Sequence, residues 1–106
     1  MKSHYRAVVI GGGVVGASTL YHLAKMGWSD VVLLEKLEYT SGSTWHAAGL
    51  LPLFNMSYSV GKIHKYSVDL YQSLEEETGQ QVSFHKTGNL RLARNQERMD
   101  EYKRYC

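Results

Sequence analysis

The stretch that decides the fold is an apolar run followed by a glycine turn at residues 7–16, Ala7-Val8-Val9-Ile10-Gly11-Gly12-Gly13-Val14-Val15-Gly16. The β-branched run at residues 7–10 predicts a strand buried on both faces, as in a parallel sheet. Helix-forming residues follow over 14–25, and Gly27 stands where such a helix would end. A second apolar run at residues 31–34 completes a strand–helix–strand unit. The predicted fold class is therefore α/β.

The glycines of this turn have a spacing with a specific chemical use. Gly11, Gly13 and Gly16 form G-x-G-x-x-G, in which the first makes the tight turn, the second admits a pyrophosphate and the third lets helix and sheet pack closely. Glu35 follows at the end of the second strand, where a carboxylate accepts hydrogen bonds from an adenosine ribose. The pattern predicts a dinucleotide site without separating nicotinamide from flavin. The alternative is a structural glycine turn with a solvated Glu35-Lys36 pair.

Composition sets limits on the class of protein. The chain has 106 residues, which corresponds to one domain at most. Hydrophobic residues make up 43% and charged residues 21%, which excludes a disordered tail and a coiled coil. The net charge of +2 indicates neither a nucleic acid nor a membrane as partner. With one cysteine, Cys106, and no targeting or membrane segment in the sequence, we expect a cytoplasmic protein, as in a bacterial cell.

The remaining residues predict further elements. An irregular, apolar loop covers 39–55, with a short helix expected around Ala47. A helix over 59–78 ends at Gly79, and its expected buried stripe is Val60, Ile63, Ser67, Leu70 and Leu74. Alternating runs at 82–84 and 90–92 predict a β-hairpin, and Asn95 is expected to cap a helix over 96–105.

The number of predicted strands is too small for a complete doubly wound sheet, and no terminating signal follows the last helical stretch. We therefore expect an N-terminal fragment of a longer protein, an incomplete domain. Residues 1–80 would be the N-terminal part of a cofactor-binding domain. Residues 81–106 would be the first hairpin and helix of a substrate domain.

Two segments carry a family resemblance. Residues 31–36 (VVLLEK) and 41–50 (SGSTWHAAGL) resemble the flavin-binding start of the dimethylglycine and sarcosine dehydrogenase family, within the D-amino-acid-oxidase-like FAD enzymes. The resemblance covers nearly all of the chain, and the family's proteins are much longer. It implies a Rossmann-like FAD-binding start and oxidation of an N-methyl glycine derivative, with hydride transfer to FAD. It also implies formaldehyde release or, in folate-carrying relatives, transfer to tetrahydrofolate.

The resemblance assigns a special role to one histidine. In this family the histidine of the Ser-Thr-Trp-His motif is bonded covalently to the flavin 8α-methyl group, which implies His46 here. Judged from position alone, a histidine beside Trp45 is more often a packed structural residue. The expected cofactor-binding residues are Gly11, Gly12, Gly13, Val14, Val15, Gly16, Glu35, Lys36, Gly42, Ser43, Thr44, Trp45, His46, Ala47, Ala48, Gly49 and Leu50.

Other roles are assigned less specifically by the sequence. No histidine pair has metal-ligand spacing, so no metal is expected, and no catalytic base is named. Arg91 and Arg94 either face a carboxylate substrate or form a solvated face. The electron acceptor would be oxygen or an electron-transfer flavoprotein. Three alternatives stay open: an amino-acid oxidase with noncovalent FAD, a truncated chain without activity, and a nicotinamide dehydrogenase, which leaves the Ser-Thr-Trp-His segment unexplained.

Overall fold

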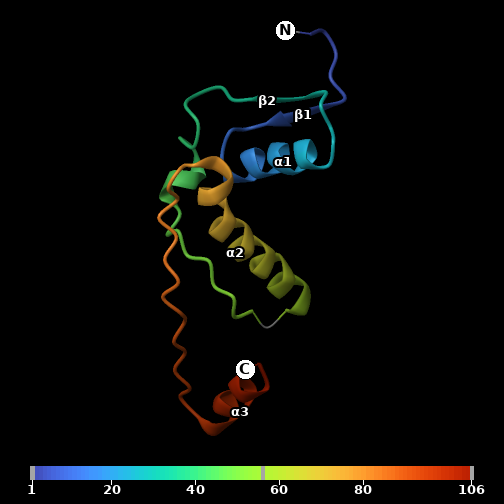
Figure 1. The fold of residues 1–106 in the computed structure, drawn as a ribbon. Coiled ribbons are helices and arrows are strands. Elements are labelled where there is room, and N and C mark those ends of the chain that lie inside the picture. Colours follow the sequence, from blue (N-terminus) through green and yellow to red (C-terminus); the bar gives the residue numbers. More distant parts are fainter. Residues whose placement is uncertain (1, 56, 106) are drawn as a thin grey trace. The chain divides into compact units, whose positions relative to one another are not determined.

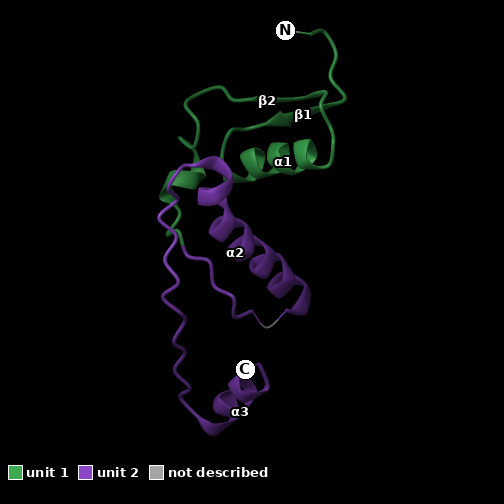
Figure 2. Ribbon diagram, viewed as in Figure 1, with its two compact units in different colours: residues 1–49 green, residues 50–106 purple. Residues whose placement is uncertain are grey.

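The computed structural model describes residues 2–55 and 57–105. Its elements in chain order are β1 (Ala7–Ile10), α1 (Val14–Lys25), β2 (Val31–Leu34), the 3-10 helix η1 (Ser43–His46), α2 (Tyr58–Thr78) and α3 (Gln96–Tyr105) (Figure 1). The chain divides into two compact units, residues 1–49 and residues 50–106 (Figure 2). The α/β class is confirmed. The domain boundary expected after residue 80 stays a prediction.

The first unit contains the predicted strand–helix–strand arrangement. β1 and β2 pair in parallel, with Ala7 opposite Val31 and Ile10 opposite Leu34. The Gly11 amide extends the pairing by donating to the Leu34 carbonyl at 2.8 Å. α1 connects the strands and packs against both of them (Figure 1). All three elements have the bounds that the sequence predicted.

The two faces of this sheet differ in exposure. Leu33 lies on the face that α1 covers, where it lines a shallow hollow together with Ala17 and Leu20 of the helix. On the other face Val8 is 50% exposed and Ile10 is 84% exposed. The prediction that these strands are buried on both faces is therefore wrong for this chain, because a single helix covers only one face of a sheet.

The end of α1 shows why a glycine is needed there. Gly27 has φ of 85°, in the left-handed region that favours glycine. Its amide donates to the Ala24 carbonyl at 2.9 Å, and the Trp28 amide donates to the Leu23 carbonyl at 3.0 Å. This pair of bonds is the Schellman arrangement, which satisfies the last free carbonyls of the helix. The chain then turns directly into β2.

α2 is the longest helix of the second unit. It ends as predicted at Gly79, which has φ of 70° and donates its amide to the Glu75 carbonyl at 2.9 Å. The expected buried stripe is partly wrong, because Val60 and Ile63 are exposed while Val68 is 6% exposed. The His64 Nδ1 donates to the Pro52 carbonyl at 2.7 Å. The helix therefore turns the face that carries His64, which lies next to the predicted stripe, toward the residues before α2.

The predicted hairpin is not formed. Residues 80–93, all of them described, contain no strand, and Leu90 and Leu92 are largely exposed. The physical reason is that a two-stranded hairpin is only marginally stable unless a larger sheet or a helix covers its apolar face. α3 follows as predicted, with Asn95 Oδ1 accepting the Arg98 amide at 2.9 Å. Within the described ranges, no helix has both the length and the apolar character needed to cross a membrane.

Candidate functional site

The glycine turn between β1 and α1 is built from contacts that exclude side chains. Gly11 has φ of 107°, which favours glycine. A Cβ on Gly16 would lie 1.8 Å from the Gly11 carbonyl oxygen, so α1 approaches the turn too closely for any side chain. Gly13 is the extended residue that immediately precedes α1, and it offers no side chain of its own to cap the helix. The turn therefore presents bare backbone at the N-terminus of a helix.

The Glu35 carboxylate connects the end of β2 to this turn. Its Oε2 accepts the Gly12 amide at 2.6 Å, and its Oε1 accepts the amides of Lys36 at 2.7 Å and Leu37 at 2.9 Å. These hydrogen bonds, chiefly the one from Gly12, lower the pKa of Glu35 below its ordinary value. The carboxylate is thus held charged beside the glycine turn, and its remaining lone pairs suit hydroxyl donors.

Two residues that sequence reasoning missed cover the turn. A Cβ on Gly12 would lie 2.6 Å from Cδ1 of Tyr39, so the tyrosine ring occupies the space next to that glycine. The Thr40 amide donates to the Gly12 carbonyl at 3.1 Å, and Thr40 has φ of 66°. The only signal in the sequence is an aromatic residue shortly after Glu35, which does not by itself indicate a contact with the turn.

η1 carries the Ser-Thr-Trp-His segment to the start of α1. The Val14 amide donates to Thr44 Oγ1 at 2.9 Å. Within the segment, the Trp45 indole N–H donates to the Ser41 carbonyl at 3.0 Å, and the Trp45 and His46 rings lie 3.7 Å apart between centroids. His46 Nδ1 lies 3.2 Å from the Gly42 carbonyl oxygen. The expected short helix thus occurs about one turn earlier than around Ala47.

The structure brings most of the predicted cofactor residues together in the first unit. The glycine turn, Glu35 with the backbone of Lys36, and the Gly42–His46 segment are linked by the hydrogen bonds described above. Ala47, Ala48 and Gly49 follow η1 in the same unit, whereas Leu50 belongs to the second unit and is 80% exposed. Bare glycine backbone, a helix N-terminus and a charged hydroxyl acceptor fit the pyrophosphate and ribose of a dinucleotide.

Metal ligands do not gather in the part of the chain that the structure describes. No group of three or more His, Cys, Asp or Glu side chains lies close enough there to hold an ion. The residues of the glycine turn and η1 offer backbone amides, hydroxyls and one imidazole instead.

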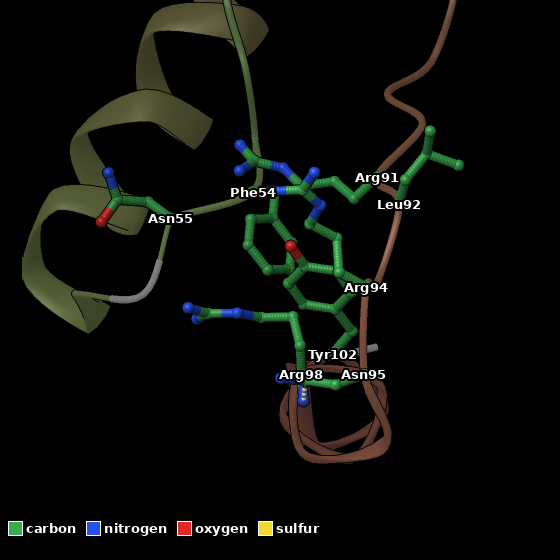
Figure 3. A pocket seen from close by; sticks show the side chains of 8 residues that line it. All are labelled: Phe54, Asn55, Arg91, Leu92, Arg94, Asn95, Arg98 and Tyr102. Atoms are coloured by element: carbon green, nitrogen blue, oxygen red, sulfur yellow. Dashed lines mark hydrogen bonds between the residues drawn. The ribbon is translucent and has the colours of Figure 1, made fainter.

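The second unit has a separate hollow of about 700 Å³ between the Phe54 segment and α3 (Figure 3). Two of the three arginines that line it, Arg91 and Arg98, are engaged with their neighbours. The Arg91 guanidinium lies 4.5 Å from the centre of the Phe54 ring, and Arg98 pairs with Glu101. The Phe54 ring also meets Tyr102 edge-on at 5.6 Å. These contacts explain how α3 is held against Phe54, and they use Arg91 and Arg98 as structural groups.

Known proteins resemble this chain over nearly its whole length. The family described as FAD dependent oxidoreductase (DAO) matches residues 6–106. Dimethylglycine dehydrogenase of Rattus norvegicus is 58% identical over 102 residues, which are 96% of this chain and 12% of that protein. Sarcosine dehydrogenase of Homo sapiens is 47% identical over 105 residues, which are 98% of this chain and 11% of that protein. Both names include the word mitochondrial.

A solved structure agrees with the sequence relationship. Glycine oxidase from Bacillus cereus ATCC 14579 has a TM-score of 0.67 and 28% identity, and the match covers 95% of this chain and 29% of that one. The chain spans only about an eighth of the length of the two dehydrogenases. Because the family match extends from residue 6 to residue 106, the chain belongs to the FAD dependent oxidoreductase family.

Proposed function

We propose that this chain is an FAD-binding segment of a flavin enzyme that oxidises an N-methyl glycine derivative, dimethylglycine or sarcosine. The observation that carries the proposal is the bond from the Val14 amide to Thr44, which joins the Ser-Thr-Trp-His segment to the glycine turn. The names and identities of the two dehydrogenases support the substrate class. When bound, FAD would accept a hydride from the N-methyl carbon.

Each part of the site then has a role in holding the cofactor. The backbone from Gly11 to Gly16 and the N-terminus of α1 receive the pyrophosphate. Glu35 accepts hydrogen bonds from the ribose hydroxyls, next to the backbone of Lys36. The segment from Gly42 to Leu50 borders the flavin. Because the Glu35 carboxylate is already fixed by three backbone amides, little ordering of that side chain is needed when the ribose binds.

His46 is proposed to be the covalent attachment residue. A carbonyl oxygen only accepts hydrogen bonds, so the contact with Gly42 places the ring proton on Nδ1 and leaves the lone pair on Nε2. Attachment forms a bond from Nε2 to the 8α carbon and breaks one C–H bond there, with the proton lost to water. Bound FAD would take up the electron pair of that C–H bond, and the pair would then pass to the two-electron acceptor that serves turnover. The alkylated imidazole then releases its Nδ1 proton to water.

A denaturing gel tests the attachment. The FAD-loaded protein is precipitated with acid, separated under denaturing conditions and scanned for flavin fluorescence. We expect fluorescence on the protein band, its loss in His46→Ala and its retention in His85→Ala, an exposed histidine outside the site. A dark wild-type band with FAD in the supernatant would instead favour an amino-acid oxidase with noncovalent FAD.

Turnover assays test the substrate class and the acceptor. Flavin bleaching under anaerobic conditions should occur with dimethylglycine or sarcosine and should be much slower with glycine, which lacks the N-methyl carbon. Bleaching by glycine alone would contradict the proposal. Oxygen or an electron-transfer flavoprotein is the proposed acceptor, and reoxidation by air separates the two. Tetrahydrofolate as acceptor of the one-carbon unit and a cytoplasmic location are further proposals, tested by formaldehyde yield and by cell fractionation.

A further inference from the structure

We infer that Thr44 is a positioning residue for flavin attachment. Its hydroxyl accepts the first amide of α1, which joins η1 to the helix and thereby fixes the position of His46. The inference rests on the proposed function, because it concerns the step in which His46 becomes bonded to FAD. It adds to that function a residue, Thr44, that affects the reaction only by positioning His46. The contacts that support it all lie within the first unit.

Thr44 caps α1 from outside the helix. The first amides of a helix have no partner within it, and a side chain at the residue before the helix usually accepts one of them. Gly13 occupies that position and has no side chain, so the Val14 amide donates to Thr44 Oγ1 instead, at 2.9 Å across a separation of 30 residues. The threonine is half-buried. The cap is therefore also a link between two distant segments.

The link depends on close approach to a glycine. A Cβ on Gly13 would lie 2.9 Å from Thr44 Oγ1, which is closer than two such atoms normally come. The absence of a side chain at Gly13 thus gives room to the hydroxyl as well as to a pyrophosphate. A threonine is suited to this position because it supplies both an acceptor and a stiff χ1 angle.

His46 shares the turn that Thr44 anchors. The Ala47 amide donates to the Thr44 carbonyl at 3.2 Å, and His46 Nδ1 contacts the Gly42 carbonyl. The Trp45 ring lies tilted against the His46 ring, and its indole N–H donates to the Ser41 carbonyl. These bonds hold the turn together internally, and Thr44 Oγ1 joins it to the helix start. Removing the hydroxyl should leave the turn intact and change its position, together with that of His46.

The rate of attachment tests this role. FAD is added to the FAD-free protein, and the acid-stable flavin fraction is followed with time. We expect Thr44→Val to bind FAD yet attach it about ten- to hundredfold more slowly, because displacing a reacting group by about 1 Å has effects of that size. Thr44→Ser should restore the wild-type rate. Thr19→Val is the matched control, since it removes a hydroxyl that bonds within α1 and should leave the rate unchanged.

A second variant removes the other partner of the same bond. Val14→Pro deletes the amide at the first position of α1, where proline is tolerated and where the extended Gly13 suits it. If both changes act through one hydrogen bond, the double variant should be no slower than the slower single variant. This variant also provides the test if Thr44→Val does not fold.

Three results would overturn the inference. They are an unchanged rate in Thr44→Val, a serine variant as slow as the valine variant, or additive effects in the double variant. Loss of all FAD binding in Thr44→Val would show a direct binding role instead. Failure of the proposed function looks different, because wild-type protein would then carry no acid-stable flavin, or His46→Ala would keep it.

Discussion

Glu35 and Gly12 are joined by a hydrogen bond of 2.6 Å from the glycine amide to the carboxylate, across 23 residues of sequence. This bond ties the end of β2 to the glycine turn at the start of α1. It also couples the protonation of one carboxyl group to the geometry of the proposed cofactor site.

Stability should depend on pH through this carboxylate. The pKa of Glu35 is lower in the folded chain than in the unfolded chain, because the Gly12 and Leu37 amides stabilise the charged form. The resulting stabilisation is fully present above the ordinary pKa of a glutamate and is lost as pH falls through the lower pKa of the folded chain. Glu35→Gln should be less stable than wild type near neutral pH, and the difference should shrink in acid. Urea unfolding of both proteins from about pH 7 to about pH 3 measures this.

Glu38→Gln serves as the control for that series, because it removes a carboxylate from the same loop and should leave the wild-type pH profile in place. A difference between Glu35→Gln and wild type that stays constant down to acid pH would contradict the assignment.

Gly16→Ala should strongly disturb the first unit. The added Cβ would lie 1.8 Å from the Gly11 carbonyl oxygen, so α1 and the turn must move apart. Overpacking of this kind typically costs about 1–3 kcal/mol, and more where backbone atoms collide. The free energy of unfolding and the FAD affinity should both fall. Gly61→Ala in α2 has open space for its Cβ and should instead raise helix stability by about 0.5–1 kcal/mol. Equal effects of the two substitutions would contradict the packing argument.

Thr40→Asn should stabilise the loop over the glycine turn. Thr40 has φ of 66°, and a left-handed conformation costs an ordinary residue about 1–2 kcal/mol, whereas asparagine adopts it more readily. We expect a gain of about 1 kcal/mol in the free energy of unfolding, with the Gly12 carbonyl bond retained. Thr40→Val keeps the branched side chain and should show no gain. A loss of stability in the asparagine variant would mean that the threonine side chain has a role that its conformation does not reveal.

Asn95→Ala should loosen the start of α3. Asn95 Oδ1 accepts the Arg98 amide at 2.9 Å, and loss of such a cap costs about 1 kcal/mol. Hydrogen exchange at the Arg98 amide should become about fivefold faster, which is the equivalent of that free energy. Asn95→Asp keeps an acceptor at the same position and should exchange at the wild-type rate. Unchanged exchange in the alanine variant would show that the cap contributes nothing.

Local patterns predicted the first unit well. The bounds of β1, α1 and β2 follow from short apolar runs, a glycine turn and the Gly27 stop, which are all encoded within about ten neighbouring residues. Asn95 was likewise predicted correctly as a cap. These features depend on neighbours in sequence, and such features can be identified from a single chain.

Features that depend on distant partners were harder to predict. The Leu90 and Leu92 run alternates as a strand should, yet without a sheet to join it forms no ladder. Tyr39 next to Gly12 and Thr44 on Val14 join segments that no periodicity connects. The motif predicted Thr44 to be a cofactor-binding residue, but its capping of α1 emerges only from the three-dimensional arrangement.

The uncovered face of the small sheet has a consequence for biosynthesis. Val8, Ile10 and Leu34 form a complete apolar surface once β2 has paired with β1, an event that needs only the segment up to residue 34, and nothing after it, to have left the ribosome. For as long as nothing covers them, these side chains and the free strand edges are available to any other exposed strand. A nascent chain at this stage is therefore a natural client for holding chaperones, and its yield in cells should depend on how soon that face is covered.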